Sequence, residues 1–211
     1  MTIYIIKMIP QVIFQTSLEK QPEYVIQTIQ KKCKGWEYKH YTDNEIIQYL
    51  LMNPDPEFPF ILNKFHSMNF GAHKADLFRY YFLYKQGGVF MDSDAMIETN
   101  IDTIVKDYDF FSVKSNINNT IFQGFIGCVP KNPIIYAALK DVYTIDVDHL
   151  TKFYHLLTAN MYTIIFNGNH TNYKLYKELP SDDVKAITVD DFENQILIHY
   201  WKDKTIPFTL V

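Results

Sequence analysis

The sequence predicts an α/β fold built as one domain that covers residues 1–211. A chain of this length, with 47% hydrophobic residues, can bury one substantial core and is too short for two independent ones. Its first half alternates short aromatic or β-branched runs with runs of helical spacing. An apolar run at 89–91 also follows directly from an apolar helix pattern and stops at Asp92. Such alternation is typical of a sheet packed against helices, so we expect an α/β sandwich.

The N-terminal part supplies two strand and helix pairs in turn. IYIIKMIPQVIFQ reads as a first strand or strand pair broken at Pro10, and residues 22–33 place apolar side chains at helical spacing. WEYKHYT alternates as a second strand, with Trp36 and Tyr38 on one face. Asp43 is the expected N-cap of the helix NEIIQYLL.

The central part predicts a buried helix followed at once by a strand. Residues 72–86 contain no helix breaker and are apolar or aromatic nearly all round from Leu77 to Tyr84. Gly87 is expected to end this helix, and the strand VFM then ends at Asp92. The remaining expected elements are strands at 109–114, 120–130 and 194–201 and helices at 133–143 and 150–166.

Composition excludes several classes of protein. The net charge of −4 and the scattered lysines argue against binding to nucleic acid. Two cysteines, Cys33 and Cys128, do not form a disulfide framework, so we expect reduced thiols. The apolar N-terminus carries Lys7 and Pro10 and lacks a cleavage site or a run of about 20 apolar residues. We therefore expect a cytoplasmic protein with no membrane span, whose contact with a membrane would be peripheral.

Two aspartates after the central strand, Asp92 and Asp94, are the first candidates for a site. The 16 aspartates of the chain predict about one Asp-x-Asp pair by chance, and the sequence has three, so the motif alone says little. The context of this pair is more telling, because open α/β sheets bind ligands beyond the carboxyl ends of their strands. Carboxylates there suit Mg²⁺ or Mn²⁺ and leave coordination positions open for phosphate oxygens.

Asp76 and Arg79 form a second candidate pair on the buried helix. Their spacing of three places them on one helix face, where they either form an internal ion pair or project into a cleft. Arg79 is the only arginine beside 19 lysines. A guanidinium recognises ligands through several donors in one plane, which an ammonium group does not, and this favours a binding role.

Four segments together resemble the glycosyltransferases of the DXD sugar-binding family. They are IPQVIFQTS, GWEYKHYTDNEI, KADLFRYYFLYKQGGVFMDSDA and the terminal HYW. The family includes capsular-polysaccharide transferases, fungal α-mannosyltransferases and, at a greater distance, the glucosylating domains of clostridial toxins. The resemblance implies a GT-A fold, which is a Rossmann-like sandwich with a central, mostly parallel sheet flanked by helices.

The resemblance also implies a set of site residues. Asp92 and Asp94 would bind the donor and Mn²⁺ or Mg²⁺, with Asp94 on the metal itself and His199 facing the metal or the diphosphate. Asp76 and Arg79 would hold the donor sugar. Gln15 and Thr16 would lie against the nucleoside and Trp201 would cover the diphosphate; Asp92, Asp94 and Arg79 would carry catalysis.

The function expected from this resemblance is a metal-dependent, retaining transfer of a hexose from a UDP- or GDP-sugar to a glycan, glycoconjugate or other hydroxyl acceptor. Two alternatives stay open on the residues alone. A metal-dependent hydrolase of nucleotide sugars would release free sugar without an acceptor. A non-catalytic carbohydrate-binding domain, suggested by the abundant Phe and Tyr, would need no metal.

Overall fold

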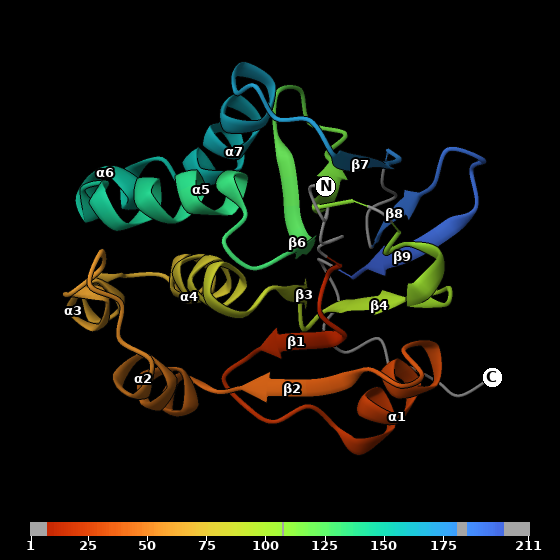
Figure 1. Ribbon diagram of the computed structural model, residues 1–211, viewed down its shortest axis with the longest axis horizontal. Helices are drawn as coiled ribbons and strands as arrows, with labels where there is room; N and C mark the ends of the chain where they lie inside the picture. The colour runs from red at the N-terminus through yellow and green to blue at the C-terminus, as the bar shows by residue number, and fades with distance from the viewer. Residues whose placement is uncertain (1–7, 107, 181–184, 201–211) are drawn as a thin grey trace, which may run out of the picture.

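The computed structural model describes residues 8–106, 108–180 and 185–200, which form one large sheet with helices on both faces (Figure 1). The elements in chain order are β1 (Val12–Thr16), α1 (Glu23–Lys32), β2 (Glu37–Tyr41), α2 (Asp43–Met52), α3 (Ile61–Ser67), α4 (Gly71–Gln86), β3 (Gly88–Met91), β4 (Ala95–Ile97), the 3-10 helix η1 (Ile101–Thr103), β5 (Phe110–Lys114), β6 (Ile121–Cys128), α5 (Pro133–Thr144), α6 (Val147–Lys152), α7 (Leu156–Asn167), β7 (Tyr173–Glu178), β8 (Ala186–Val189) and β9 (Gln195–His199). The predicted α/β class is confirmed.

The sheet has the strand order β2-β1-β3-β6-β5-β7-β8-β9-β4. Within the described ranges its pairings are mixed, with β1 parallel to both β2 and β3, β5 parallel to β7, and the other five pairs antiparallel. Because β1, β2 and β3 run in the same direction, their carboxyl ends meet at one edge. Thr16 and Asp92 therefore lie at the same edge of the sheet.

The two faces of the sheet carry separate cores. Phe14 and Phe90 point to the face covered by α2 to α7, while their neighbours Ile13 and Val89 point to the face covered by α1. Figure 1 shows the helices divided in this way about the strands. This division follows from the period of two along a strand, which sends successive side chains to opposite faces.

Helix α4 is buried on all sides, as its sequence predicts. Every residue from Asp76 to Tyr84 is buried. The tyrosines are tolerated there because their hydroxyls find partners: Tyr81 donates to the Asn53 carbonyl at 2.6 Å and Tyr84 to Glu57 at 3.2 Å. Gly87 ends the helix with a φ of 69°, a conformation that glycine adopts without strain. The chain then enters β3 and delivers Asp92 to the sheet edge.

Three expectations need correction or fall outside the described residues. The N-cap of α2 is Thr42, whose backbone N–H donates to Glu45 Oε2 at 2.9 Å, and Asp43 is the first helical residue. The expected helix at 150–166 is two helices, because Phe153 leaves the helical conformation with φ −115° and ψ 71°. The part of the expected first strand before residue 8 lies outside the described residues.

No helix in the described ranges is both long and apolar enough to cross a membrane.

Candidate functional site

Asp92 is held at the sheet edge by its backbone. Its N–H donates to the Gly124 carbonyl at 2.8 Å, and its carbonyl accepts from Gln15 Nε2 at 2.8 Å. Gln15 is fully buried, and its Oε1 accepts from the Tyr38 hydroxyl at 2.9 Å. These bonds leave the carboxylate of Asp92 as the part of the residue that faces outward.

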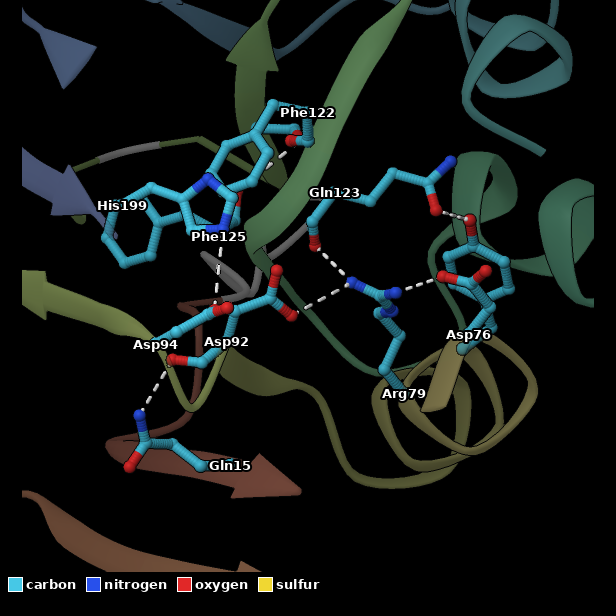
Figure 2. A network of polar contacts seen from close by, with 11 residues as sticks. Gln15, Asp76, Arg79, Asp92, Asp94, Phe122, Gln123, Phe125 and His199 are labelled. Atoms are coloured by element: carbon cyan, nitrogen blue, oxygen red, sulfur yellow. Dashed lines mark hydrogen bonds and ion pairs between the residues drawn. The ribbon is translucent and has the colours of Figure 1, made fainter. Parts of the chain in front are cut away.

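The short strand β4 brings the end of β9 to Asp94. Ala95 pairs with His199, and Tyr200 N–H donates to the Asp94 carbonyl at 2.8 Å. His199 Nε2 consequently lies 3.4 Å from Asp94 Oδ1. The imidazole is packed on the ring of Phe122, with ring centroids 4.6 Å apart at 34°. His199, which is more than 100 positions along the chain from Asp94, is thus fixed beside it (Figure 2).

Asp92, Asp94 and His199 form a cluster with metal-ligating chemistry. One ligand atom from each lies within 4.8 Å of the others. Ligands of a six-coordinate Mg²⁺ at about 2.1 Å lie roughly 3 Å apart when adjacent and roughly 4.2 Å apart when opposite. The observed limit of 4.8 Å lies somewhat above the longer of these distances, so the side chains would have to move closer together to bind one ion. Two carboxylates and an imidazole are donor groups that fit a hard divalent cation such as Mn²⁺.

Arg79 connects this cluster to helix α4. Its guanidinium pairs with Asp76, and its Nη1 donates to the Gln123 carbonyl at 2.6 Å and lies 3.6 Å from Asp92 Oδ1 (Figure 2). The group also lies over the ring of Phe90, with Cζ 4.6 Å from the ring centroid. Among the described residues, nothing accepts a hydrogen bond from its buried Nε.

The sequence allowed two interpretations of Asp76 and Arg79, as an internal ion pair or as a pair that projects into a cleft, and these two interpretations do not exclude each other. The pair is buried and internal, with Asp76 8% and Arg79 6% exposed, yet both residues line a cleft.

The electrostatics of the cluster favour a cation. Burial raises the pKa of Asp92, Arg79 opposes that rise, and the charge of Asp94 adds to it. Burial lowers the pKa of His199, but its hydrogen bond to Asp94 and the charge of Asp92 outweigh this, so the pKa stands above its ordinary value. Two carboxylates share one site in this arrangement. A divalent cation would relieve their repulsion and favour their ionised forms.

A cleft of about 600 Å³ opens beside the cluster. Asp76, Arg79, Asp92 and His199 line part of it. The rest of the lining comes from the start of α4, β6 and the turn before it, the α6–α7 turn and the start of α7, the end of β7 and the start of β8. A volume in this range is typical of small-molecule sites, which span about 300–1,000 Å³. The four predicted site residues that line it come from three separate segments of the chain.

The other predicted site residues have different outcomes. Gln15 is 0% exposed and both its polar atoms are bonded inside the protein, and its contact with a nucleoside stays a prediction. Thr16 is partly exposed at the end of β1. Trp201 lies outside the described residues. Of the other Asp-x-Asp pairs, Asp146 caps α6 by accepting from the His149 N–H at 3.0 Å.

Two residues that support the site were not predicted. A Cβ on Gly124 would lie 2.2 Å from Asp92 Oδ2, so only glycine admits the carboxylate in this position. Phe122 supports His199 from the same strand, β6. The glycines within FQGFIGC were the available sequence signal, since a glycine inside a strand marks a close approach.

Comparison with known proteins finds similarity to glycosyltransferases. Residues 19–111 match the family described as the glycosyltransferase sugar-binding region containing the DXD motif. The inositol phosphoceramide mannosyltransferase 1 of Schizosaccharomyces pombe is 26% identical over 119 residues, which are 56% of this chain and 36% of that protein. The mannosyl phosphorylinositol ceramide synthase SUR1 of Saccharomyces cerevisiae is 27% identical over 140 residues, 64% of this chain and 35% of that protein.

A viral relative and a solved structure extend the comparison. The uncharacterized glycosyltransferase L373 of Acanthamoeba polyphaga mimivirus is 24% identical over 177 residues, 83% of this chain and 65% of that protein. The solved structure titled PaToxG Glycosyltransferase superposes with a TM-score of 0.59 at 13% identity, over 76% of this chain and 70% of that chain.

The chain spans about a third of the length of the two yeast relatives. The match nevertheless runs from α1 to the first two residues of β5 and includes Asp76, Arg79 and both aspartates of the motif. Residues 19–111 of this chain are thus similar to the glycosyltransferase sugar-binding region that contains the DXD motif.

Proposed function

We propose that this chain is a metal-dependent, retaining glycosyltransferase that moves a hexose from a UDP- or GDP-sugar to a hydroxyl group of a glycan or glycoconjugate. The observation that carries the proposal is the cluster of Asp92, Asp94 and His199 beside a cleft lined by Arg79. A family resemblance alone would leave the chemistry open. The cluster supplies the one group of residues in the described ranges with metal-ligating spacing.

In this proposal Asp94, Asp92 and His199 hold Mn²⁺ or Mg²⁺. When bound, the cation supplies positive charge to the diphosphate as it leaves. The backbone bonds of Asp92 to Gly124 and Gln15 fix the carboxylate before the ligand arrives. Gln15 therefore also acts by positioning Asp92, and Thr16 is the partly exposed residue of β1 that would contact the nucleoside.

Arg79 and Asp76 have the role of holding the donor sugar. The buried Nε of Arg79 has no acceptor among the described residues, and an unsatisfied buried donor costs about 1–3 kcal/mol. A sugar hydroxyl in the cleft could accept from it. Because Arg79 is also 3.6 Å from Asp92, the same guanidinium would link the sugar to the metal cluster.

Mannose is the first donor sugar to test, because the two yeast relatives are named as mannosyl-transferring enzymes. Their names also place an inositol phosphoceramide among the acceptor classes to test. The hydrolase alternative uses the same metal cluster, and product analysis separates it, since it forms free sugar only. The binding-module alternative is disfavoured because the largest fully buried side chains are Tyr and Phe residues of the core.

A thermal-shift screen of UDP- and GDP-sugars with and without Mn²⁺ tests the proposal. A ligand at about 100 times its Kd stabilises the native state by about 2.7 kcal/mol. For a chain of this size that corresponds to a rise in Tm of about 5–10 °C. We expect the rise with one class of nucleotide sugar, only in the presence of metal, and not in Asp94→Asn. No rise with any donor, or an equal rise without metal, would contradict the proposal.

A further inference from the structure

A group of aromatic rings around Tyr154 lines part of the cleft. The ring of Tyr154 is contacted by three other rings, those of Phe70, His73 and His155, at centroid distances of 5.4, 5.1 and 5.0 Å. His73 is 2% exposed, and its Nε2 lies 3.0 Å from the Tyr154 carbonyl. Helix α4 and the α6–α7 turn therefore fix this ring together. Tyr154 nevertheless keeps 45% of its surface exposed and lines the cleft.

The cleft is larger than the transferred sugar needs. A hexose has about 12 non-hydrogen atoms, and at the ~30 Å³ that each water occupies in the liquid this gives an upper bound of about 360 Å³. The cleft of about 600 Å³ leaves room beyond a sugar held by Arg79 and Asp92. This step depends on the proposed function, which places the donor sugar at those residues. Tyr154, His155 and Thr158 are among the residues that line this cleft.

The chemistry of this part of the lining suits a neutral ring that carries hydroxyl groups. No lysine lies among the described residues that line the cleft, and the one arginine, Arg79, already pairs with Asp76. An anionic group would find no free lysine or arginine among these residues. A pyranose or cyclitol presents a face of C–H groups, which carry partial positive charge and pack on the negative face of an aromatic ring. Its hydroxyls would face the polar lining, which includes Asn116 and Thr158.

We propose that Tyr154, braced by His73, is the platform of an acceptor subsite for a neutral pyranose or cyclitol ring. An acceptor hydroxyl oxygen bonds to the anomeric carbon of the donor sugar there. The bond from that carbon to the diphosphate oxygen breaks, the nucleoside diphosphate leaves with the electron pair, and the hydroxyl proton passes to the leaving phosphate or to water. Tyr154 orients the acceptor ring and takes no proton.

The test compares two reactions of the same preparation. Donor consumption is measured with GDP-mannose or UDP-glucose and Mn²⁺, first without acceptor and then with methyl α-D-mannopyranoside or myo-inositol as the acceptor probe. The variants are Tyr154→Ala and Tyr154→Phe. Phe153→Ala is the matched control, because Phe153 is the adjacent residue, has a similar exposure of 47% and does not line the cleft.

We expect Tyr154→Ala to raise the KM for the acceptor probe about two- to tenfold, because this factor corresponds to the binding free energy of one aromatic contact. The ratio of acceptor-dependent to acceptor-free turnover should fall accordingly. Tyr154→Phe keeps the ring face and should behave as the wild type, as should Phe153→Ala.

Three results would overturn this inference. The first is that neither probe accelerates donor consumption by the wild type. The second is that Tyr154→Ala matches Phe153→Ala. The third is that Tyr154→Ala lowers acceptor-free turnover as strongly as transfer, which would place the ring at the donor sugar. A wild type that binds and consumes no nucleotide sugar would instead refute the proposed function itself.

Discussion

Replacement of Gly124 by alanine should damage the metal cluster through two of its members. The new Cβ would lie 2.2 Å from Asp92 Oδ2 and 2.3 Å from Cζ of Phe122, the ring that supports His199. To restore a contact distance of about 3.5 Å, the carboxylate oxygen must move by roughly 1.3 Å. That displacement is more than half the length of a ~2.1 Å metal bond.

The expected loss of metal affinity follows from this displacement of the carboxylate oxygen. Changing a group that positions a metal ligand typically weakens metal binding about 10- to 100-fold, or about 1.4–2.7 kcal/mol. The extra methyl group should also lower the free energy of unfolding by about 1–3 kcal/mol, as other overpacked sites do. Isothermal titration of the metal-free protein with Mn²⁺ measures the first effect, and chemical denaturation measures the second.

Gly127→Ala separates the two effects. Gly127 lies on the same strand, and an added Cβ would meet the ring of Phe111 at 2.1 Å, a core residue that is not part of the metal cluster. This control should lose stability and keep the Mn²⁺ affinity of the wild type. If Gly124→Ala binds Mn²⁺ as tightly as Gly127→Ala does, Asp92 and His199 do not act as metal ligands in the arrangement described.

Three further outcomes are expected. His199→Ala should weaken Mn²⁺-dependent nucleotide binding with little change in Tm; an early-melting variant with normal binding would make His199 a structural residue. Arg79→Lys should lower kcat/KM about 30- to 1,000-fold, because an ammonium cannot contact Asp76, Gln123 and a sugar in fixed directions; near-normal turnover in a stable variant would contradict this. Hydrogen bonds from Lys20 and Thr42 lower the pKa of Glu45 to about 2. The contribution of Glu45 to stability is therefore present above its unfolded pKa of about 4.3 and is lost as the pH falls through both values. The Tm difference between wild type and Glu45→Gln should shrink on acidification, and a constant difference would contradict the assignment.

The elements that the sequence predicted are those with long, unambiguous patterns. Helix α4 was predictable because its apolar side chains run all round, which only a buried helix tolerates, and Gly87 marks its end. Asp92 and Asp94 followed from their place at the end of an apolar strand. The periodicity that defines these elements is local, so sequence alone is enough to find it.

The elements and contacts that escaped prediction depend on partners far along the chain. Strand β4 has three residues, too few for a pattern, and exists because it pairs with β9. That pairing is what places His199 beside Asp94, so only the family resemblance indicated its role. The hydrogen bonds of Gln15 with Tyr38 and with the carbonyl of Asp92 also join residues far apart in the chain, and no local pattern indicated them.

The order and direction of the strands in the sheet also depend on contacts between distant parts of the chain. Sequence patterns predict that strands exist and not which strands pair, so the family fold led to a mostly parallel expectation. In the described ranges β6 inserts antiparallel between β3 and β5. This insertion brings Gly124 and Phe122 to the metal cluster, which no local pattern could have shown.

The central claim is that Asp94 holds a metal on which sugar transfer depends. The most direct measurement is consumption of the nucleotide sugar identified by the thermal-shift screen, as Mn²⁺ is titrated into metal-free wild type and Asp94→Ala. We predict turnover in the wild type that rises with Mn²⁺ and vanishes with chelator, and none in Asp94→Ala, whose Tm should match or exceed that of the wild type because a clustered charge is removed. Turnover by Asp94→Ala at the wild-type rate, or wild-type turnover that persists in chelator, would contradict the claim.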